Sequence, residues 1–179
     1  MAFAAKAAAR LRNSKIGIIG HPYEGMTDLM QDNFAVMETL GATCWPIQPD
    51  EVTDAFLAAS EKDAGRLVEE ERAKGRKIEV EAPLMLRSAR LALALEKVVE
   101  AGGYDAVAEF DQAWLADERV GVIPFYGTSR MVERHVPFTC EADVLRAAAM
   151  LVLEELAGHA TFLEHYILDH KRGRVFESH

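Results

Sequence analysis

Three residues with metal-binding side chains occupy the C-terminal part of the chain. Glu141 follows an apolar run, Glu164 lies beyond the next amphipathic segment, and His179 is the last residue of the sequence. Carboxylates placed just after a strand and just after the following helix can converge in space, and hard divalent cations prefer carboxylate oxygens. An acid at such a junction can also simply cap the helix, which is the role we expect for Asp143. For Glu141 we expect a position facing a ligand.

An alternation of strand-like and helix-like segments must position these side chains. Short apolar runs predict strands at residues 15–20, 43–47, 104–110, 120–125 and 136–140. Helical spacing of apolar residues, ended by glycines, predicts helices at residues 1–12, 27–40, 50–57, 84–102 and 142–156, with an exposed helix or excursion at 60–77. This alternation indicates an α/β fold: an open, mostly parallel Rossmann-like or flavodoxin-like sheet with helices on both faces.

The sequence changes character after Gly158. Residues 161–168 and 174–176 have strand propensity and flank a turn at 171–173, so we expect a C-terminal β-hairpin. We divide the chain into an α/β domain at 1–158 and a hairpin at 159–179. The hairpin is either an antiparallel edge of the sheet or the start of a truncated second domain.

Composition excludes some classes of partner. The chain has 20 Lys and Arg against 29 Asp and Glu, a formal net charge of -9, so we expect no nucleic-acid and no membrane partner. No apolar run is long enough for a membrane span. The two cysteines, Cys44 and Cys140, lie in or beside apolar runs typical of buried reduced thiols, which favours a cytoplasmic location.

Several other residues could contact a ligand. Four of the six histidines lie between residues 159 and 179, which favours a metal site, although we interpret His159 and His165 as surface residues. The loop at 20–26 has neither the dinucleotide glycine pattern nor a phosphate loop. Residues 110–114 and 127–130 are predicted loops whose polar groups suit a polyol, but Ser129 lacks the surroundings of a hydrolase nucleophile.

Three segments carry a resemblance to a known family. They are Lys-Ile-Gly-Ile-Ile-Gly-His-Pro-Tyr-Glu-Gly-Met-Thr-Asp at 15–28, Phe-Thr-Cys-Glu-Ala-Asp-Val-Leu-Arg-Ala-Ala-Ala-Met-Leu at 138–151, and Thr-Phe-Leu-Glu-His-Tyr at 161–166, which leads to His179. Together they resemble the L-fucose isomerase and L-arabinose isomerase family of metal-dependent sugar isomerases. The middle segment is the most specific of the three.

The resemblance implies a site and a reaction. It implies that Glu141, Glu164 and His179 bind Mn²⁺ or a similar divalent cation, and that Gln112 and Trp114 contact a small sugar substrate. The reaction would be aldose-ketose isomerisation through an ene-diol, with the two glutamates abstracting and donating the proton in an order left open. Members of the family are also homo-oligomers in which a neighbouring subunit helps to close each site.

Size separates this chain from the family. Its members carry a further α/β domain before the matched segments and a β-rich domain after them, so we expect a fragment or a shortened relative. The alternative function is a non-catalytic sugar-binding or oligomer-assembly domain of the same ancestry. A receiver-type signalling domain is disfavoured, because Asp28 and Asp50 do not form the acidic cluster that it needs.

Overall fold

Four parallel strands form one open sheet at the centre of the protein. The structure is a computed structural model that describes residues 2–178. The strands are β1 (Lys15–Ile19), β2 (Thr43–Ile47), β3 (Ala106–Glu109) and β4 (Phe138–Thr139), in the spatial order β2-β1-β3-β4. The predicted α/β class with a parallel sheet is therefore confirmed, and this strand order is that of flavodoxin-like sheets.

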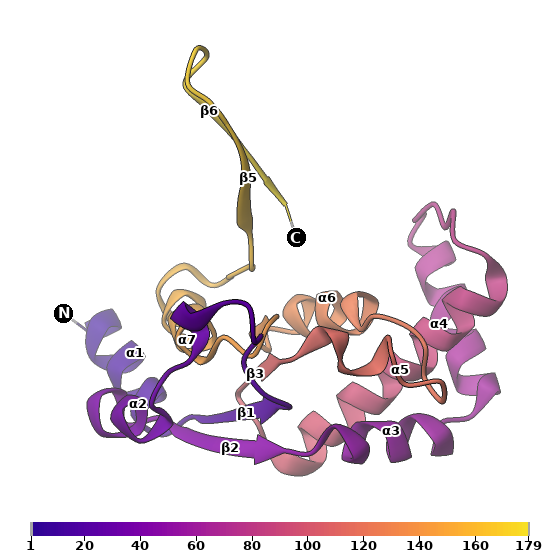
Figure 1. Ribbon diagram of the computed structural model, residues 1–179, viewed down its shortest axis with the longest axis horizontal. Helices are drawn as coiled ribbons and strands as arrows, with labels where there is room; N and C mark the ends of the chain where they lie inside the picture. Colours follow the sequence, from indigo (N-terminus) through magenta and orange to yellow (C-terminus); the bar gives the residue numbers. More distant parts are fainter. Residues whose placement is uncertain (1, 179) are drawn as a thin grey trace.

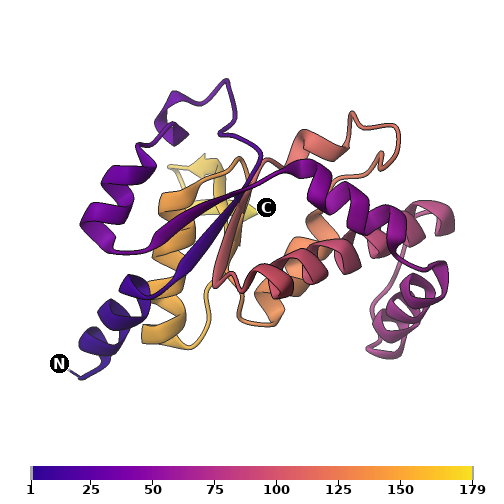
Figure 2. The ribbon, with the colours of Figure 1, turned by 90° about the horizontal axis from the view of Figure 1, so that it is seen from below.

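Helices cover both faces of the sheet, as Figure 2 shows from below. One face carries α3 (Pro49–Ala58), α5 (Ala82–Gly102) and α6 (Phe125–Glu133). The other face carries α1 (Ala2–Arg12), α2 (Asn33–Leu40) and α7 (Val144–Ala157), with α1 packed against α7. Along β1, Ile16 and Ile18 point into the second layer and Ile19 into the first, the alternation expected of a strand buried on both sides.

The C-terminal hairpin is separate from the main sheet. Strands β5 (Glu164–Asp169) and β6 (Arg174–Ser178) pair antiparallel and form a two-stranded sheet of their own. Figure 1 shows the hairpin projecting away from the layered body. The hairpin was predicted correctly, but among residues 2–178 it is not an edge of the parallel sheet.

The predicted exposed helix at 60–77 is α4 (Glu61–Ala73), which packs on the outside of α5. Its Ala64, Leu67 and Val68 are buried against Ala89 and Ala92 of α5. This segment is therefore one amphipathic outer helix with an apolar stripe, rather than an excursion without anchors.

Two local predictions were wrong. Residues 120–125 form no strand, because Val120 and Val122 enter the core from a loop, and the predicted loop at 127–130 is part of α6. The helix predicted from residue 27 begins only at Asn33, because the Asp32 carboxylate accepts hydrogen bonds from the next free amides and caps the helix there. A short 3₁₀ turn, η1 (Thr27–Leu29), precedes it.

The sequence predicts neither a membrane span nor a disulfide. No helix within residues 2–178 is long and apolar enough to cross a bilayer. Cys44 and Cys140 are not joined in a disulfide, as expected. Burial raises the pKa of both thiols.

Candidate functional site

The carboxyl ends of neighbouring strands meet at one edge of the sheet, where α/β proteins commonly bind ligands. Three hydrogen bonds join the segments that leave these strands. The amide of Ala142 donates to the carbonyl oxygen of Glu109 at 2.7 Å, and the amide of Tyr23 donates to the carbonyl oxygen of Glu141 at 3.2 Å. The amide of Glu141 donates to Oδ1 of Asp111 at 3.4 Å. The segment after β4 is thereby fixed against the segments after β1 and β3.

The turn that presents Glu141 has an unusual backbone. Glu141 and Ala142 have φ angles of 57° and 58°, in the left-handed region that residues with a Cβ atom rarely adopt. Asp143 then caps α7 by accepting a hydrogen bond from the amide of Arg146, which is the role predicted for it. Thr139 donates its buried hydroxyl to the carbonyl oxygen of Asp143 at 2.9 Å. Strained backbone held by such bonds is typical of functional sites.

The negative charges of Glu109, Asp111, Glu141 and Glu164 all raise the pKa of Cys140, the residue before this turn, and we call these four carboxyl groups the acidic centre. Burial raises the pKa of Glu141 above its ordinary value, and the negative charges of Glu164, Asp111 and Asp28 raise it further. Arg146 acts in the opposite direction. Burial and neighbouring negative charges both favour the protonated form of a carboxyl group, so Glu141 keeps its proton to a higher pH than an ordinary glutamate does.

Glu109 is the most deeply buried member of the acidic centre. It ends β3 with an exposed fraction of 0%, and within the described residues neither of its carboxyl oxygens has a hydrogen-bond partner. Burial raises the pKa of Glu109 well above its ordinary value, and the charge of Asp111 adds to this effect. Burial of Glu109 without a partner therefore favours the protonated, uncharged form of its carboxyl group.

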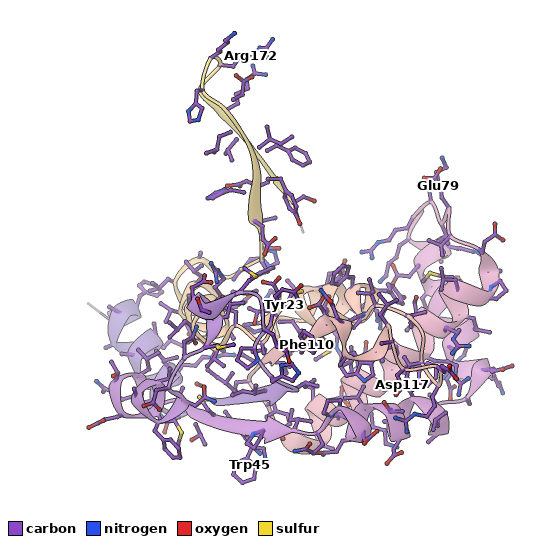
Figure 3. The ribbon with its side chains drawn as sticks, viewed as in Figure 1. Tyr23, Trp45, Glu79, Phe110, Asp117 and Arg172 are labelled. Atoms are coloured by element: carbon purple, nitrogen blue, oxygen red, sulfur yellow. The ribbon has the colours of Figure 1, made fainter. Side chains whose placement is uncertain are left out.

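Aromatic rings lie at the same edge of the sheet. The ring of Phe110 stacks at a tilt on the imidazole of His21, with 4.6 Å between centroids, and lies 6.1 Å from the ring of Tyr23. Figure 3 shows Tyr23 and Phe110 side by side below the base of the hairpin. Apolar and aromatic walls beside a few converging polar groups are typical of small-molecule sites.

The structure brings together some of the predicted site residues. Glu141 and Glu164 belong to one centre, although one follows β4 and the other begins β5. Gln112 is exposed on the 3₁₀ helix η2 (Asp111–Trp114) that follows β3. Trp114 is 1% exposed and packs in the core, where its indole N–H donates to the carbonyl oxygen of Pro49 at 3.4 Å. His179 lies outside the described residues.

The other predicted polyol-binding segment, 127–130, belongs to α6 as described above. Thr128 and Ser129 line a cavity of about 260 Å³ together with Cys140 and His159. Arg130 is engaged elsewhere, since its guanidinium forms ion pairs with the buried Glu71 and with Glu96. This segment therefore offers hydroxyl groups but not its arginine.

Sequence reasoning missed two members of the acidic centre. Glu109 lies within the run Ala-Val-Ala-Glu-Phe, and Asp111 follows two residues later. An acid within a run that must be buried on both faces is itself a signal, because burying a carboxyl without a partner costs free energy. Glu109 and Asp111 therefore extend the predicted pair of Glu141 and Glu164 to a set of four.

The charges of Asp111 and Glu164 act on Glu141, but within the described residues no three ligand atoms of the acidic centre lie within 4.8 Å of one another. No known family model matches the chain, and no curated protein sequence matches it significantly. The assignment of a function therefore depends on the chemistry of this site and on the sequence resemblance.

Proposed function

We propose that the chain is the metal- and sugar-binding unit of an aldose-ketose isomerase of the L-fucose and L-arabinose isomerase type. In this proposal the acidic centre holds Mn²⁺ or a similar divalent cation, and the substrate is a small sugar. The fold class agrees with this proposal but does not distinguish it from other functions that α/β sheets support. The site therefore has to carry the argument.

The observation that carries it is the electrostatic interaction between Glu141 and Glu164 in the folded chain. The charge of Glu164 raises the pKa of Glu141, although 22 positions separate the two residues in sequence. Like charges gathered at the edge of a sheet repel each other, and a bound divalent cation would relieve this repulsion. The same two residues are the acids that the resemblance assigns to the metal.

The side chains can perform the proton transfer that the reaction needs. Isomerisation moves a proton between adjacent sugar carbons, and negative charge develops on the neighbouring oxygens. A divalent cation supplies electrostatic stabilisation of that charge when it is bound. Glu141, with its raised pKa, suits a group that gains and loses a proton, and Glu164 is the second proton-transfer group. Gln112 is exposed and offers an amide to sugar hydroxyls.

The proposal can be tested by titrating the chelator-treated chain with Mn²⁺. Calorimetry measures the heat of binding, and electron paramagnetic resonance measures the free Mn²⁺ that remains. Glu141→Gln and Glu164→Gln are each expected to weaken Mn²⁺ binding by roughly tenfold or more, because each removes a charged oxygen ligand. Both variants should also abolish interconversion of an aldose and its ketose in a panel of sugars.

Glu79→Gln provides the matched control. Glu79 is exposed beyond the end of α4, and Figure 3 shows it far from Tyr23 and Phe110. The control should bind Mn²⁺ as the parent does. Isomerase activity that survives Glu141→Gln would refute the site assignment, and parent-like Mn²⁺ affinity in both acidic-centre variants would refute the cation site.

The hairpin supports a second candidate function, assembly with another copy of the chain. Ile167 faces Phe176 across the two strands and Leu168 faces Val175, and all four side chains are exposed. Adjacent residues of a strand point to opposite faces, so the hairpin is apolar on both sides. An isolated two-stranded sheet is marginally stable in water, and burial of these faces in a homo-oligomer would stabilise it.

Light scattering of the purified chain tests the assembly function. We expect a homo-oligomer whose dissociation is favoured by Ile167→Ser and Phe176→Ser, because each removes an exposed apolar side chain from the contact. Thr161→Ser, a change just before the hairpin, is the control. A parent chain that is monomeric at all concentrations would leave the hairpin without this role.

A further inference from the structure

A group of metal-binding side chains lies at the opposite end of β4 from Glu141. His135 is in the turn between α6 and β4, Glu154 is in the last turns of α7, and His159 follows the glycine that ends α7. One ligand atom from each residue can be chosen so that all three lie within 4.8 Å of one another. Nδ1 of His135 is 2.9 Å from Oε2 of Glu154, and Nδ1 of His159 is 3.9 Å from Oε1.

The carboxylate in this group is fixed in position by the protein. The Glu154 side chain has an exposed fraction of 7%, and its Oε1 accepts a hydrogen bond from the amide of Ala160 at 2.9 Å. The two imidazoles project from different segments toward it and meet edge to face, with 6.1 Å between centroids. A buried, oriented carboxylate between two rings is a partly preorganised ligand set.

Charge balance favours a cation at this place. The ion pairs of Glu154 are with the two histidines, which carry charge only when they are protonated. A neutral imidazole nitrogen can act as a metal ligand, and a divalent cation would balance the negative charge of the Glu154 carboxylate.

We propose that His135, Glu154 and His159 form a second metal site, which selects Zn²⁺ or a similar borderline-soft divalent cation. Two imidazoles and one carboxylate suit Zn²⁺ better than Mn²⁺ or Mg²⁺, which prefer oxygen ligands. Both histidines are exposed, so a fourth coordination position is open to water or to a ligand. The bound ion would tie the turn before β4 to the end of α7. This inference departs from the interpretation of His159 as an ordinary surface residue.

Calorimetric titration of the full chain with Zn²⁺, without a histidine tag and after chelator treatment, tests this site. The double variant Glu141→Gln, Glu164→Gln removes two carboxylates of the acidic centre, and it should still bind one equivalent of Zn²⁺. Adding His159→Ala or His135→Asn should weaken Zn²⁺ binding by at least roughly tenfold. A loss of this size is expected even for a residue that only hydrogen-bonds to a metal ligand. Asn is chosen because His135 has a φ of 62°, which Asn tolerates.

Two further measurements separate a metal site from a purely structural ion pair. Zn²⁺ should raise the melting temperature of the Glu141→Gln, Glu164→Gln double variant and leave that of the two histidine variants made from it unchanged. Co²⁺ bound to the double variant should give the visible absorption of a tetrahedral site. His170→Ala removes an exposed imidazole from the hairpin turn and should behave as the parent. An unchanged Zn²⁺ affinity in both histidine variants would overturn the proposal. It would also be overturned if the histidine substitutions lowered the melting temperature by the same amount with and without Zn²⁺.

Discussion

The amide of Ala142 donates a hydrogen bond of 2.7 Å to the carbonyl oxygen of Glu109. This bond joins the end of β3 to the left-handed turn after β4, so the backbone at Glu109 and the backbone of the turn that carries Glu141 are held together. The position of Glu141 is therefore set by the sheet and not by the flexibility of a loop. Preorganisation of this kind is what a cation site needs.

Replacing Glu109 by Gln is expected to change how stability depends on pH. Burial raises the pKa of Glu109, as does the nearby Asp111. At pH values between the ordinary pKa of glutamate, about 4.3, and this raised value, the unfolded chain has lost the proton while the folded chain keeps it. The folded state binds more protons there, so the free energy of unfolding falls with rising pH by about 1.4 kcal/mol per pH unit.

Denaturant titrations at about pH 5 and about pH 8 measure this effect. Relative to the parent, the Glu109→Gln variant should gain stability as the pH rises, because it has no proton to lose at this position. Glu38→Gln changes an exposed carboxyl of α2 and should give a curve parallel to that of the parent. Equal pH dependence of the Glu109→Gln variant and the parent would contradict a raised pKa.

Replacing Glu164 by Gln is expected to lower the pKa of Glu141. Burial and the charge of Asp111 remain in the variant, so the pKa should fall but stay above its ordinary value. Carbon-13 NMR of the side-chain carboxyl, recorded over a pH titration, measures this directly. Glu177→Gln, on the facing strand β6, is the control. An unchanged titration of Glu141 after Glu164→Gln would show that the two acids do not interact in solution.

Two glycines inside helices are expected to respond in opposite ways to replacement by alanine. A Cβ atom on Gly65 of α4 would meet nothing within 4 Å, so Gly65→Ala should raise the free energy of unfolding by about 0.5–1 kcal/mol. A Cβ atom on Gly127 of α6 would lie 3.0 Å from the Cα atom of Ala92 in α5. Gly127→Ala should therefore lower the free energy of unfolding by about 1–3 kcal/mol. Urea unfolding measures both, and a loss at Gly65 or a gain at Gly127 would contradict the packing described for these helices.

Removing the hairpin is expected to leave the α/β unit folded. Among the described residues, β5 and β6 pair with each other and with no strand of the main sheet. A chain that ends at Phe162 should therefore melt within a few degrees of the parent under monomeric conditions, as followed by circular dichroism. A much lower melting temperature would mean that the hairpin contributes to the stability of the α/β core. A chain that ends at Asp169 lacks β6 but keeps Glu164. Comparing the two truncated chains therefore separates the effect of losing Glu164 from the effect of losing β6.

Local signals in the sequence were sufficient for most of the elements. The predicted strand at 43–47 has the bounds of β2, and the glycines predicted to end helices, Gly41, Gly103 and Gly158, are all left-handed caps. These features depend on the residue itself and its immediate neighbours. The separation of Glu141 and Glu164 by one helix was also visible in the sequence.

The features that could not be predicted depend on tertiary contacts. The apolar residues at 120–125 resemble a strand, but they fill the core from a loop and make no ladder. The left-handed turn at Glu141 needs the bonds to β3 and to the loop after β1, which no local pattern encodes. The group of His135, Glu154 and His159 likewise exists only because α7 runs back along β4.

The hairpin has a mechanical consequence for the acidic centre. Glu164 is the first residue of β5, so it is located at the base of a two-stranded arm that projects from the body of the protein (Figure 1). A small tilt of this arm moves Glu164 relative to Glu141, which the sheet holds in place. In the proposed homo-oligomer, a contact that fixes the far end of the hairpin would therefore also fix the position of Glu164 relative to Glu141.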